Sequence, residues 1–348
     1  MTPKKCLHHW IILLMACVFS TTQAGNSNKL QYMGINLAGA EFNHGTFWPT
    51  AQEFDYFKSK GMNVFRIPFL WERIQPNLNQ AFDQNQQNNL IASVNEATSD
   101  GNYAIIDPHN YARYNGQLIG SNSVTDADFA DFWTRLANLF SNNPRVIFGL
   151  MNEPNSMPTE QWVSSANAAI VAIRAAGAQN LILVPGNAWT GAHSWEQNWY
   201  GTPNAQAMLN ISDSGNNFAF ELHQYFDSDF SGTNTFCDPN HGSAQFVAAT
   251  NWLRQQGKKG LLGEFAGANN SNCEQSINSA LQHLEDNADV WLGWTWWAAG
   301  PEWGEYIFTL EPTNNFTTDR PQMAWLEAFL ANGVDDVIFV DGFEATIN

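Results

Sequence analysis

Basic residues are scarce in this sequence. Only 15 of its 348 residues are Lys or Arg, against 33 Asp or Glu, and the formal net charge is −18 at pH 7. Nucleic acids and anionic membrane surfaces are bound through clustered Lys and Arg, and the sequence contains no basic cluster. We therefore expect no nucleic-acid partner and no membrane association of the mature chain. With charged residues at 14% of the chain, a neutral ligand is favoured.

Long apolar runs are also missing. The run from Trp10 to Phe19 is too short to span a bilayer as a helix. It follows the basic pair Lys4-Lys5 and precedes the small-residue site Thr22-Gln23-Ala24, a pattern typical of a secretory signal peptide. We expect residues 1–24 to be removed and the protein to be secreted, extracellular or periplasmic. The alternative is a lipoprotein acylated at Cys17.

Cysteine is nearly absent, with four residues in the chain. Cys6 and Cys17 fall within the predicted signal peptide, which leaves Cys237 and Cys273. An even pair in an oxidising compartment predicts a disulfide, with two free buried thiols as the alternative. Because no Cys-x-x-Cys or His-x-x-x-His spacing occurs, we expect no metal site and no cofactor.

Short apolar runs alternate with amphipathic stretches along most of the chain. Most of these runs are apolar at every position, as expected for parallel strands buried on both faces. We predict strands at Met33–Leu37, Val64–Phe69, Tyr103–Asp107, Val146–Met151, Leu181–Val184, Phe218–His223, Gly260–Glu264 and Trp291–Trp296. Helices are predicted at Ala51–Ser59, Gln86–Thr98, Asp126–Phe140, Thr159–Ala175, Ala244–Gln255, Ser276–Glu285 and Met323–Ala331. The stretch from Asn198 to Leu209 has little periodicity, so the helix of that unit is poorly defined.

Eight strand–helix units indicate a (β/α)8 TIM barrel or an open doubly wound sheet. No Gly-x-Gly-x-x-Gly motif follows the first predicted strand, which argues against a nucleotide-binding sheet. Units of about 37 residues fit a barrel of this length. We therefore predict a single α/β domain, a (β/α)8 barrel over residues 25–331. An acidic tail, 332–348, follows and has no assigned role.

Two carboxylates stand at the ends of buried strands. Glu153 lies in Asn152-Glu153-Pro154 after the fourth strand, and Glu264 lies in Gly263-Glu264-Phe265 at the end of the seventh. These two strands face one another across the mouth of a barrel. Paired carboxylates in a cleft are the minimum chemistry for cleaving a glycosidic bond, one as acid/base and one as nucleophile.

Other strand ends also carry polar or aromatic groups, and the C-terminal ends of the strands are where barrel enzymes do their chemistry. Each residue alone has an ordinary explanation: a single Glu is commonly a solvated rim residue, a single His a core residue, and Arg66 a partner for Asp107. Their joint placement favours one site. Its remaining candidate members are Arg66, His109, Asn152, His223, Tyr225 and Trp297.

The order of these strand-end residues along the chain resembles that in glycoside hydrolase family 5, a clan A retaining family. The resemblance is closest to its endo-β-1,4-glucanase (cellulase) members. The resemblance covers residues 30–330. It implies that Glu153 is the acid/base and Glu264 the nucleophile, and that Asn152 bonds the sugar 2-hydroxyl. It also implies that a supporting shell holds the carboxylates and that an aromatic platform lies beneath the sugar. These supporting residues are Arg66, His109, His223, Tyr225 and, as the platform, Trp297.

Further aromatic residues lie in predicted strand-end loops. A flat indole there can stack on the apolar face of a pyranose, although any one Trp can equally be buried packing. The predicted outer subsite residues are Trp189 and Trp303, followed by Trp48. We also expect Arg66 to keep Glu264 ionised and the cysteine pair to brace the loops beside Tyr225 and Glu264.

The expected substrate is a β-glucan polysaccharide, cleaved by a monomer. On the same scaffold a β-mannanase or a mixed-linkage glucanase is the alternative, because specificity depends on loop contacts to sugar hydroxyls. A non-catalytic carbohydrate-binding barrel is the alternative from another class. The pair Glu153 and Glu264 argues against it, since a binding protein has no need of two adjacent carboxylates that repel each other.

Overall fold

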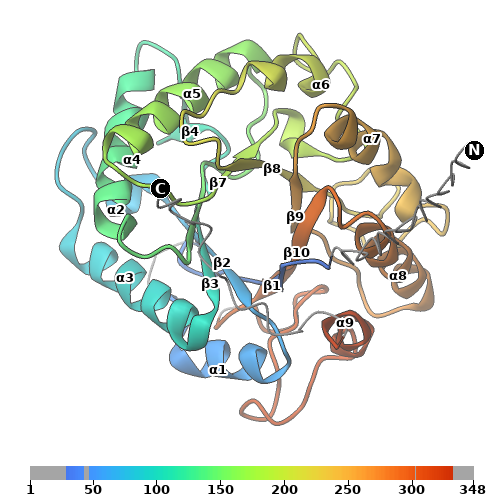
Figure 1. Ribbon diagram of the computed structural model, residues 1–348. Coiled ribbons are helices and arrows are strands. Elements are labelled where there is room, and N and C mark those ends of the chain that lie inside the picture. The colour runs from blue at the N-terminus through green and yellow to red at the C-terminus, as the bar shows by residue number, and fades with distance from the viewer. Residues whose placement is uncertain (1–28, 43–46, 302, 332–348) are drawn as a thin grey trace, which may run out of the picture.

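Eight parallel strands close into a barrel with helices around it (Figure 1). The computed structural model describes residues 29–42, 47–301 and 303–331. Around the barrel the strands run in the order β1-β10-β9-β8-β7-β6-β3-β2, which confirms the predicted (β/α)8 TIM barrel. The barrel strands are β1 (Tyr32–Leu37), β2 (Val64–Phe69), β3 (Tyr103–Pro108), β6 (Val146–Gly149), β7 (Ile182–Pro185), β8 (Phe218–His223), β9 (Gly260–Glu264) and β10 (Trp291–Ala299).

The helices follow the strands in the predicted alternation. They are α1 (Ala51–Ser59), α2 (Trp71–Ile74), α3 (Gln84–Thr98), α4 (Asp126–Phe140), α5 (Thr159–Ala175), α6 (Asn204–Ala207), α7 (Val247–Gln255), α8 (Ser271–Asp286) and α9 (Met323–Leu330). Short 3-10 turns are η1 (Ser99–Gly101), η2 (Ala188–Thr190), η3 (Met208–Asn210) and η4 (Ser243–Phe246). No helix among the described residues is long and apolar enough to cross a membrane.

Some elements differ from the prediction. The poorly periodic stretch after β7 forms only α6 and η3, and α8 begins at Ser271 because Asn270 caps it by accepting from the backbone N–H of Cys273. A small hairpin, β4 (Arg113–Tyr114) and β5 (Gln117–Leu118), was not predicted. The predicted signal peptide (1–24), with its alternative lipid site Cys17, and the acidic tail (332–348) lie outside the described residues.

The barrel interior changes from apolar to charged along the strands. Side chains alternate between the two faces of a strand, so residues two apart share a face. One apolar cluster takes a buried residue from each of seven strands: Tyr32, Val64, Ile105, Ile147, Leu183, Ala219 and Leu261. Two residues further along β2, β3 and β8 the same face carries Arg66, Asp107 and Glu221, which are all buried. A charged layer therefore lies directly above an apolar one, on the side where the strands end.

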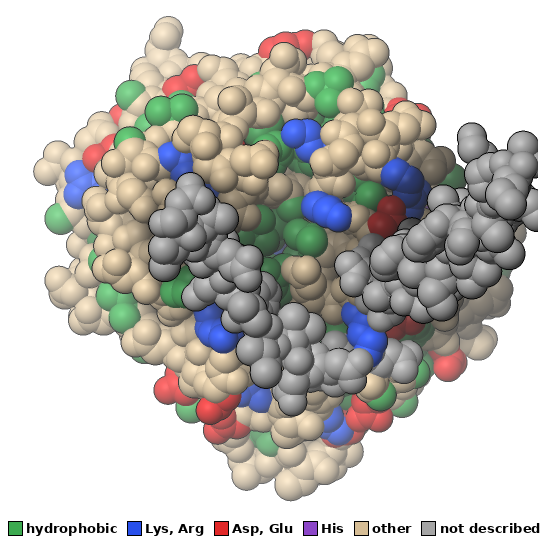
Figure 2. Space-filling model, viewed as in Figure 1, with side chains coloured by type: hydrophobic (Ala, Val, Ile, Leu, Met, Phe, Trp, Pro, Cys, Tyr) green, Lys and Arg blue, Asp and Glu red, His purple; other side chains and the backbone are tan. Residues whose placement is uncertain are grey.

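The surface shown in Figure 2 agrees with the composition. On the uncovered part of this face the Lys and Arg side chains lie apart from one another and form no continuous basic patch. The uncovered part of this face therefore offers no clustered positive charge to a polyanion.

Candidate active site

The side chain of Glu264 is held on both oxygens. Its Oε1 accepts a hydrogen bond from Arg66 Nη1 at 3.0 Å, and its Oε2 accepts one from the Tyr225 hydroxyl at 2.8 Å. Glu264 is the last residue of β9 and is 4% exposed. With both oxygens fixed, the carboxylate has one orientation toward the cavity at the barrel mouth.

Glu153 faces it from the loop after β6. Its Oε1 lies 2.8 Å from Nδ1 of His223, and one ligand-type atom each from Glu153, His223 and Glu264 lie within 4.8 Å of one another. The backbone of Glu153 is left-handed, with φ of 43°. That conformation costs a non-glycine residue about 1–2 kcal/mol and is concentrated at functional sites. The structure thus brings together the two carboxylates that the sequence predicted.

Arg66 connects the strands beneath this pair. Its guanidinium forms ion pairs with Glu264 at 3.0 Å, Asp107 at 3.0 Å and Glu221 at 2.9 Å. Nη2 also donates to Asn152 Oδ1 at 2.9 Å. Arg66 is fully buried, and a buried charge persists only where it is paired and hydrogen-bonded. The predicted pair with Asp107 is therefore present in addition to the contact with Glu264.

His109 links Asn152 to the aromatic floor. Its Nδ1 lies 2.8 Å from Asp107 Oδ2, and its Nε2 lies 3.0 Å from Asn152 Nδ2. Because an amide nitrogen only donates, Nε2 accepts and the proton of a neutral ring is on Nδ1. The ring stacks on Trp297 at 5.1 Å and 18°. The predicted supporting residues thus form one connected network around Glu264.

Burial raises the pKa of Glu264, and the charge of Glu153 adds to that rise. His223 and Arg66 act in the opposite direction. We expected Arg66 to favour the ionised form of Glu264. Its contact is present, but the loss of solvation outweighs it and the net shift of the pKa is upward.

The pKa values of the two histidines are both shifted upward. Burial by itself lowers the pKa of His223, but Glu264, Glu153 and Glu221 together raise it to about 10. For His109 burial also lowers the pKa, and Asp107 reverses the effect, so the net shift is upward. At neutral pH His223 is therefore doubly protonated and donates from both ring nitrogens.

The protonation of His223 also determines whether this group of residues can bind a metal ion. Among the described residues, Glu153, His223 and Glu264 form the group whose atoms are close enough to hold an ion. An imidazole ligates a metal through an unprotonated nitrogen. Because both nitrogens of His223 face carboxylates, His223 acts as a hydrogen-bond donor here, and the donor set does not suit a resident metal.

A cavity of about 620 Å³ opens above the carboxylates. Trp297 lies in its lining, as do the exposed indoles of Trp189 (41% exposed) and Trp199 (53% exposed), which meet edge to face at 6.3 Å. The backbone N–H of Trp189 donates to the carbonyl of Pro154, so this aromatic wall is attached to the segment that carries Glu153. Trp189 therefore lines the cavity, and its role at an outer subsite stays a prediction.

The other two predicted subsite tryptophans lie elsewhere. Trp303 is buried at 8% exposure, donates from Nε1 to the carbonyl of Ala38, and packs edge-on against Trp297 at 5.6 Å. It supports the platform and does not present a face to the cavity, so the prediction of a stacking role is corrected. Trp48 is half-buried, packs on Phe69 and donates to Gln86, outside the lining of this cavity.

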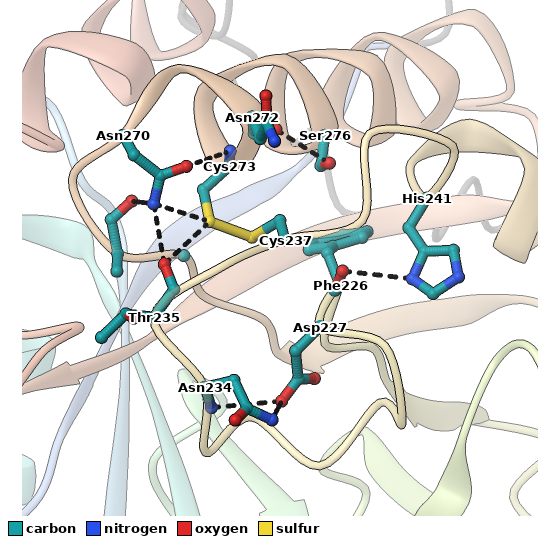
Figure 3. Close-up of a disulfide and its surroundings, with 12 residues drawn as sticks. Phe226, Asp227, Asn234, Thr235, Cys237, His241, Asn270, Asn272, Cys273 and Ser276 are labelled. Atoms are coloured by element: carbon teal, nitrogen blue, oxygen red, sulfur yellow. Dashed lines mark hydrogen bonds between the residues drawn. A yellow bond between two sulfur atoms is a disulfide. The ribbon is translucent and has the colours of Figure 1, made fainter.

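A disulfide braces the loop that carries Tyr225. Cys237 and Cys273 are bonded, as predicted (Figure 3). Asn270, at the start of α8, donates to the carbonyl of Thr235 and so ties the same two segments together. Within the loop, the carboxylate of Asp227 accepts from the backbone N–H groups of residues 232–234. The wall beside Tyr225 is therefore covalently and electrostatically fixed.

Loss of this bridge is expected to lower the free energy of unfolding. The bond closes a loop of 36 residues, and in the chain-entropy account such a constraint contributes about 3–4 kcal/mol. The double variant Cys237→Ser/Cys273→Ser, compared with the wild type in guanidinium unfolding, measures the difference. The same comparison under reducing conditions, where the wild type has also lost the bridge, is the control for the substitutions themselves. Equal midpoints for the wild type and the double variant would contradict the expectation.

The sequence reasoning missed Glu221 and Trp199. Glu221 lies two residues before His223 in an otherwise apolar strand, so the period of two placed both on one face and was the signal available. Trp199 lies in the stretch without periodicity after β7, where no pattern indicates orientation.

Comparisons with known proteins agree with this geometry. The family described as cellulase, glycosyl hydrolase family 5, matches residues 24–300. Endo-beta-1,4-glucanase A of Emericella nidulans is 43% identical over 316 residues, which is 87% of this chain and 93% of that protein. The structure of XacCel5A in complex with cellopentaose has a TM-score of 0.84 and 48% identity, covering 86% of this chain and 99% of the other. Pseudomonas stutzeri endoglucanase Cel5A with cellobiose has a TM-score of 0.80 and 34% identity, covering 87% and 93%.

Proposed function

The chain belongs to glycoside hydrolase family 5, and on that basis we propose that it is a secreted endo-β-1,4-glucanase acting with retention of configuration. The observation that carries the mechanism is that a carboxylate oxygen of Glu153 and one of Glu264 lie within 4.8 Å of each other. Retaining enzymes hold their carboxyl groups about 5–5.5 Å apart, whereas inverting enzymes need about 6.5–9.5 Å to admit a water between them. Secretion is supported by the signal-peptide pattern of residues 1–24.

In the first step Glu264 is the nucleophile. A carboxylate oxygen forms a bond to the anomeric carbon as the bond from that carbon to the glycosidic oxygen breaks, and the departing oxygen takes the proton of Glu153. The product is a glycosyl ester on Glu264. Because Arg66 and Tyr225 hold the two oxygens, the carboxylate enters the reaction without reorganisation, which is how a fixed polar site lowers a barrier.

In the second step Glu153 is the base. It takes a proton from water, the water oxygen bonds to the anomeric carbon, and the ester bond to Glu264 breaks. Two displacements at one carbon restore the original configuration. Tyr225, 2.8 Å from Glu264 Oε2, donates a hydrogen bond to the carboxylate as it leaves. His223, 2.8 Å from Glu153, keeps that carboxyl directed at the bond being broken.

The substrate assignment depends on the cavity and on the relatives. Trp297, Trp189 and Trp199 give the cavity flat apolar walls, which suit the faces of successive pyranose rings. The relatives are named endo-β-1,4-glucanases, and XacCel5A was crystallised with cellopentaose. A β-1,4-glucan such as cellulose, cleaved at internal bonds, is therefore the proposed substrate.

The test compares polysaccharides with the mature chain, residues 25–348. New reducing ends are scored on carboxymethyl cellulose, mixed-linkage β-glucan and galactomannan, with Glu264→Gln as the inactive control. Release mainly from the glucans with a rapid fall in viscosity is expected. Release mainly from galactomannan would overturn the substrate assignment. Proton NMR of a cello-oligosaccharide digest should show the β-anomer first, and initial α-anomer would contradict retention.

A further inference from the structure

Glu221 is a buried carboxylate in direct contact with the catalytic network. It is 1% exposed and lies on the interior face of β8, two residues before His223. Its Oε1 lies 3.2 Å from His223 Nε2 and 2.9 Å from Arg66 Nε. The mechanism above assigns it no step, although it contacts the histidine that contacts Glu153.

Two glycines, one on the neighbouring strand β9 and one on β6 beyond β7, leave space for this carboxylate. A Cβ at Gly263 on β9 would lie 2.3 Å from Glu221 Oε1, and one at Gly149 on β6 would lie 3.5 Å from Oε2. Under 3.0 Å a side chain at 263 cannot coexist with Glu221 as placed. Because positions 263 and 149 carry no side chain, the space around the Glu221 carboxylate stays open on both sides.

Glu221 forms ion pairs with Arg66 and His223, but not all of its hydrogen-bonding capacity is satisfied. Its Oε2 is buried and has no hydrogen-bond partner among the described residues. Burial alone would raise the pKa of Glu221, but Arg66 and His223 lower it. Burying a carboxylate with one unpaired oxygen costs free energy unless neighbouring positive charges stabilise it. Arg66 and His223 supply those charges.

We propose that Glu221 is a positioning residue that keeps His223 doubly protonated, with Nε2 donating to Glu221 and Nδ1 donating to Glu153. A neutral imidazole has one N–H and cannot donate to both carboxylates. By holding the second proton on His223, Glu221 sets the pH range over which His223 can donate to both carboxylates. This inference rests on the proposed acid/base role of Glu153.

The direction of the effect follows from the surrounding charges. The groups that face His223 are Glu153 from the loop after β6, Glu264 from β9, and Glu221 from its own strand, with Arg66 from β2 behind Glu221. Removing the Glu221 charge leaves less negative charge around the second proton of His223, so that proton is lost at a lower pH. The alkaline limb of the pH profile of kcat/KM should then move down.

The test is Glu221→Gln, which keeps the shape and one acceptor oxygen but removes the charge. We expect the alkaline limb of kcat/KM to fall by about one pH unit, which is about a tenfold loss of activity above that limb relative to the optimum. In parallel, 15N NMR of the histidine ring should show His223 doubly protonated at neutral pH in the wild type, and the titration of His223 should occur about one pH unit lower in the variant than in the wild type. A His223→Asn protein assigns the signal.

Asp107→Asn is the matched control. It removes the other buried carboxylate with an orphan oxygen on Arg66 but leaves both contacts of His223, so the His223 titration should stay at its wild-type position. An unchanged alkaline limb and an unchanged His223 titration in Glu221→Gln would overturn the proposal, as would a neutral His223 in the wild type, a result that needs no folded variant. Failure of the acid/base assignment is detected separately, by the Glu153→Ala experiment in the Discussion.

Discussion

Replacement of Glu264 by glutamine is expected to reduce kcat/KM on carboxymethyl cellulose by at least about 10⁴-fold. The amide has nearly the same shape but cannot form the glycosyl ester. Arg66 keeps Asp107 and Glu221 as partners, so no buried charge is left unpaired and the variant should remain folded. Reducing-end assays, together with thermal unfolding of both proteins, measure the two effects.

Binding distinguishes loss of chemistry from loss of the site. Because Trp297, Trp189 and Trp199 are untouched, calorimetric titration of Glu264→Gln with cellopentaose should give a dissociation constant within a few-fold of that for any catalytically dead variant that keeps the same walls, such as Glu153→Gln. Hydrolysis reduced by less than about 100-fold would contradict the nucleophile assignment. Trapping a 2-fluoro-cellobioside on the wild type should label Glu264. A label on another residue would also contradict the nucleophile assignment.

Replacement of Glu153 by alanine should affect substrates according to their leaving group. General acid catalysis contributes about 10²–10⁴-fold, so we expect a loss of that size on cellulose, where the departing oxygen needs a proton. With a dinitrophenyl cellobioside the leaving group needs none, and formation of the ester on Glu264 should proceed nearly unchanged. A burst of dinitrophenol followed by slow turnover is the expected time course.

Azide supplies the matching control for the second step. It needs no base to attack, and the alanine leaves room beside the ester, so added azide should restore turnover and yield a β-glycosyl azide. Glu264→Gln should show no such rescue. Equal losses on both substrates, or no response to azide, would mean that another group is the acid/base.

Much of this fold could be predicted because its signal is local. The strands of the barrel are buried on both faces, and runs such as Val64–Phe69 and Phe218–His223 are recognisable without knowing their neighbours. The carboxylates were found in the same way, since Glu264 ends a buried strand and Glu153 closely follows another. The weak region was the stretch after β7, where α6 and η3 are too short to show a period.

What the sequence could not indicate depends on residues distant in the chain. Trp303 is buried because Ala38 and Phe42, from the opposite end of the chain, meet it, and no pattern around position 303 indicates this. The upward shift of the Glu264 pKa likewise comes from burial by the whole barrel mouth, which outweighs the contact with Arg66 that led us to expect an ionised Glu264.

Arg66 has a consequence for how activity arises during folding. Through this one side chain, Asn36, Asp107, Asn152, Glu221 and Glu264 are joined from five separate units of the chain. Glu264 is synthesised long after Arg66, and its oxygen receives its donor only when the late units dock beside the early ones. Chains truncated before those units therefore have no active site, not even a partly active one. The rate of cellulose hydrolysis should therefore be proportional to the fraction of molecules in which the barrel has closed.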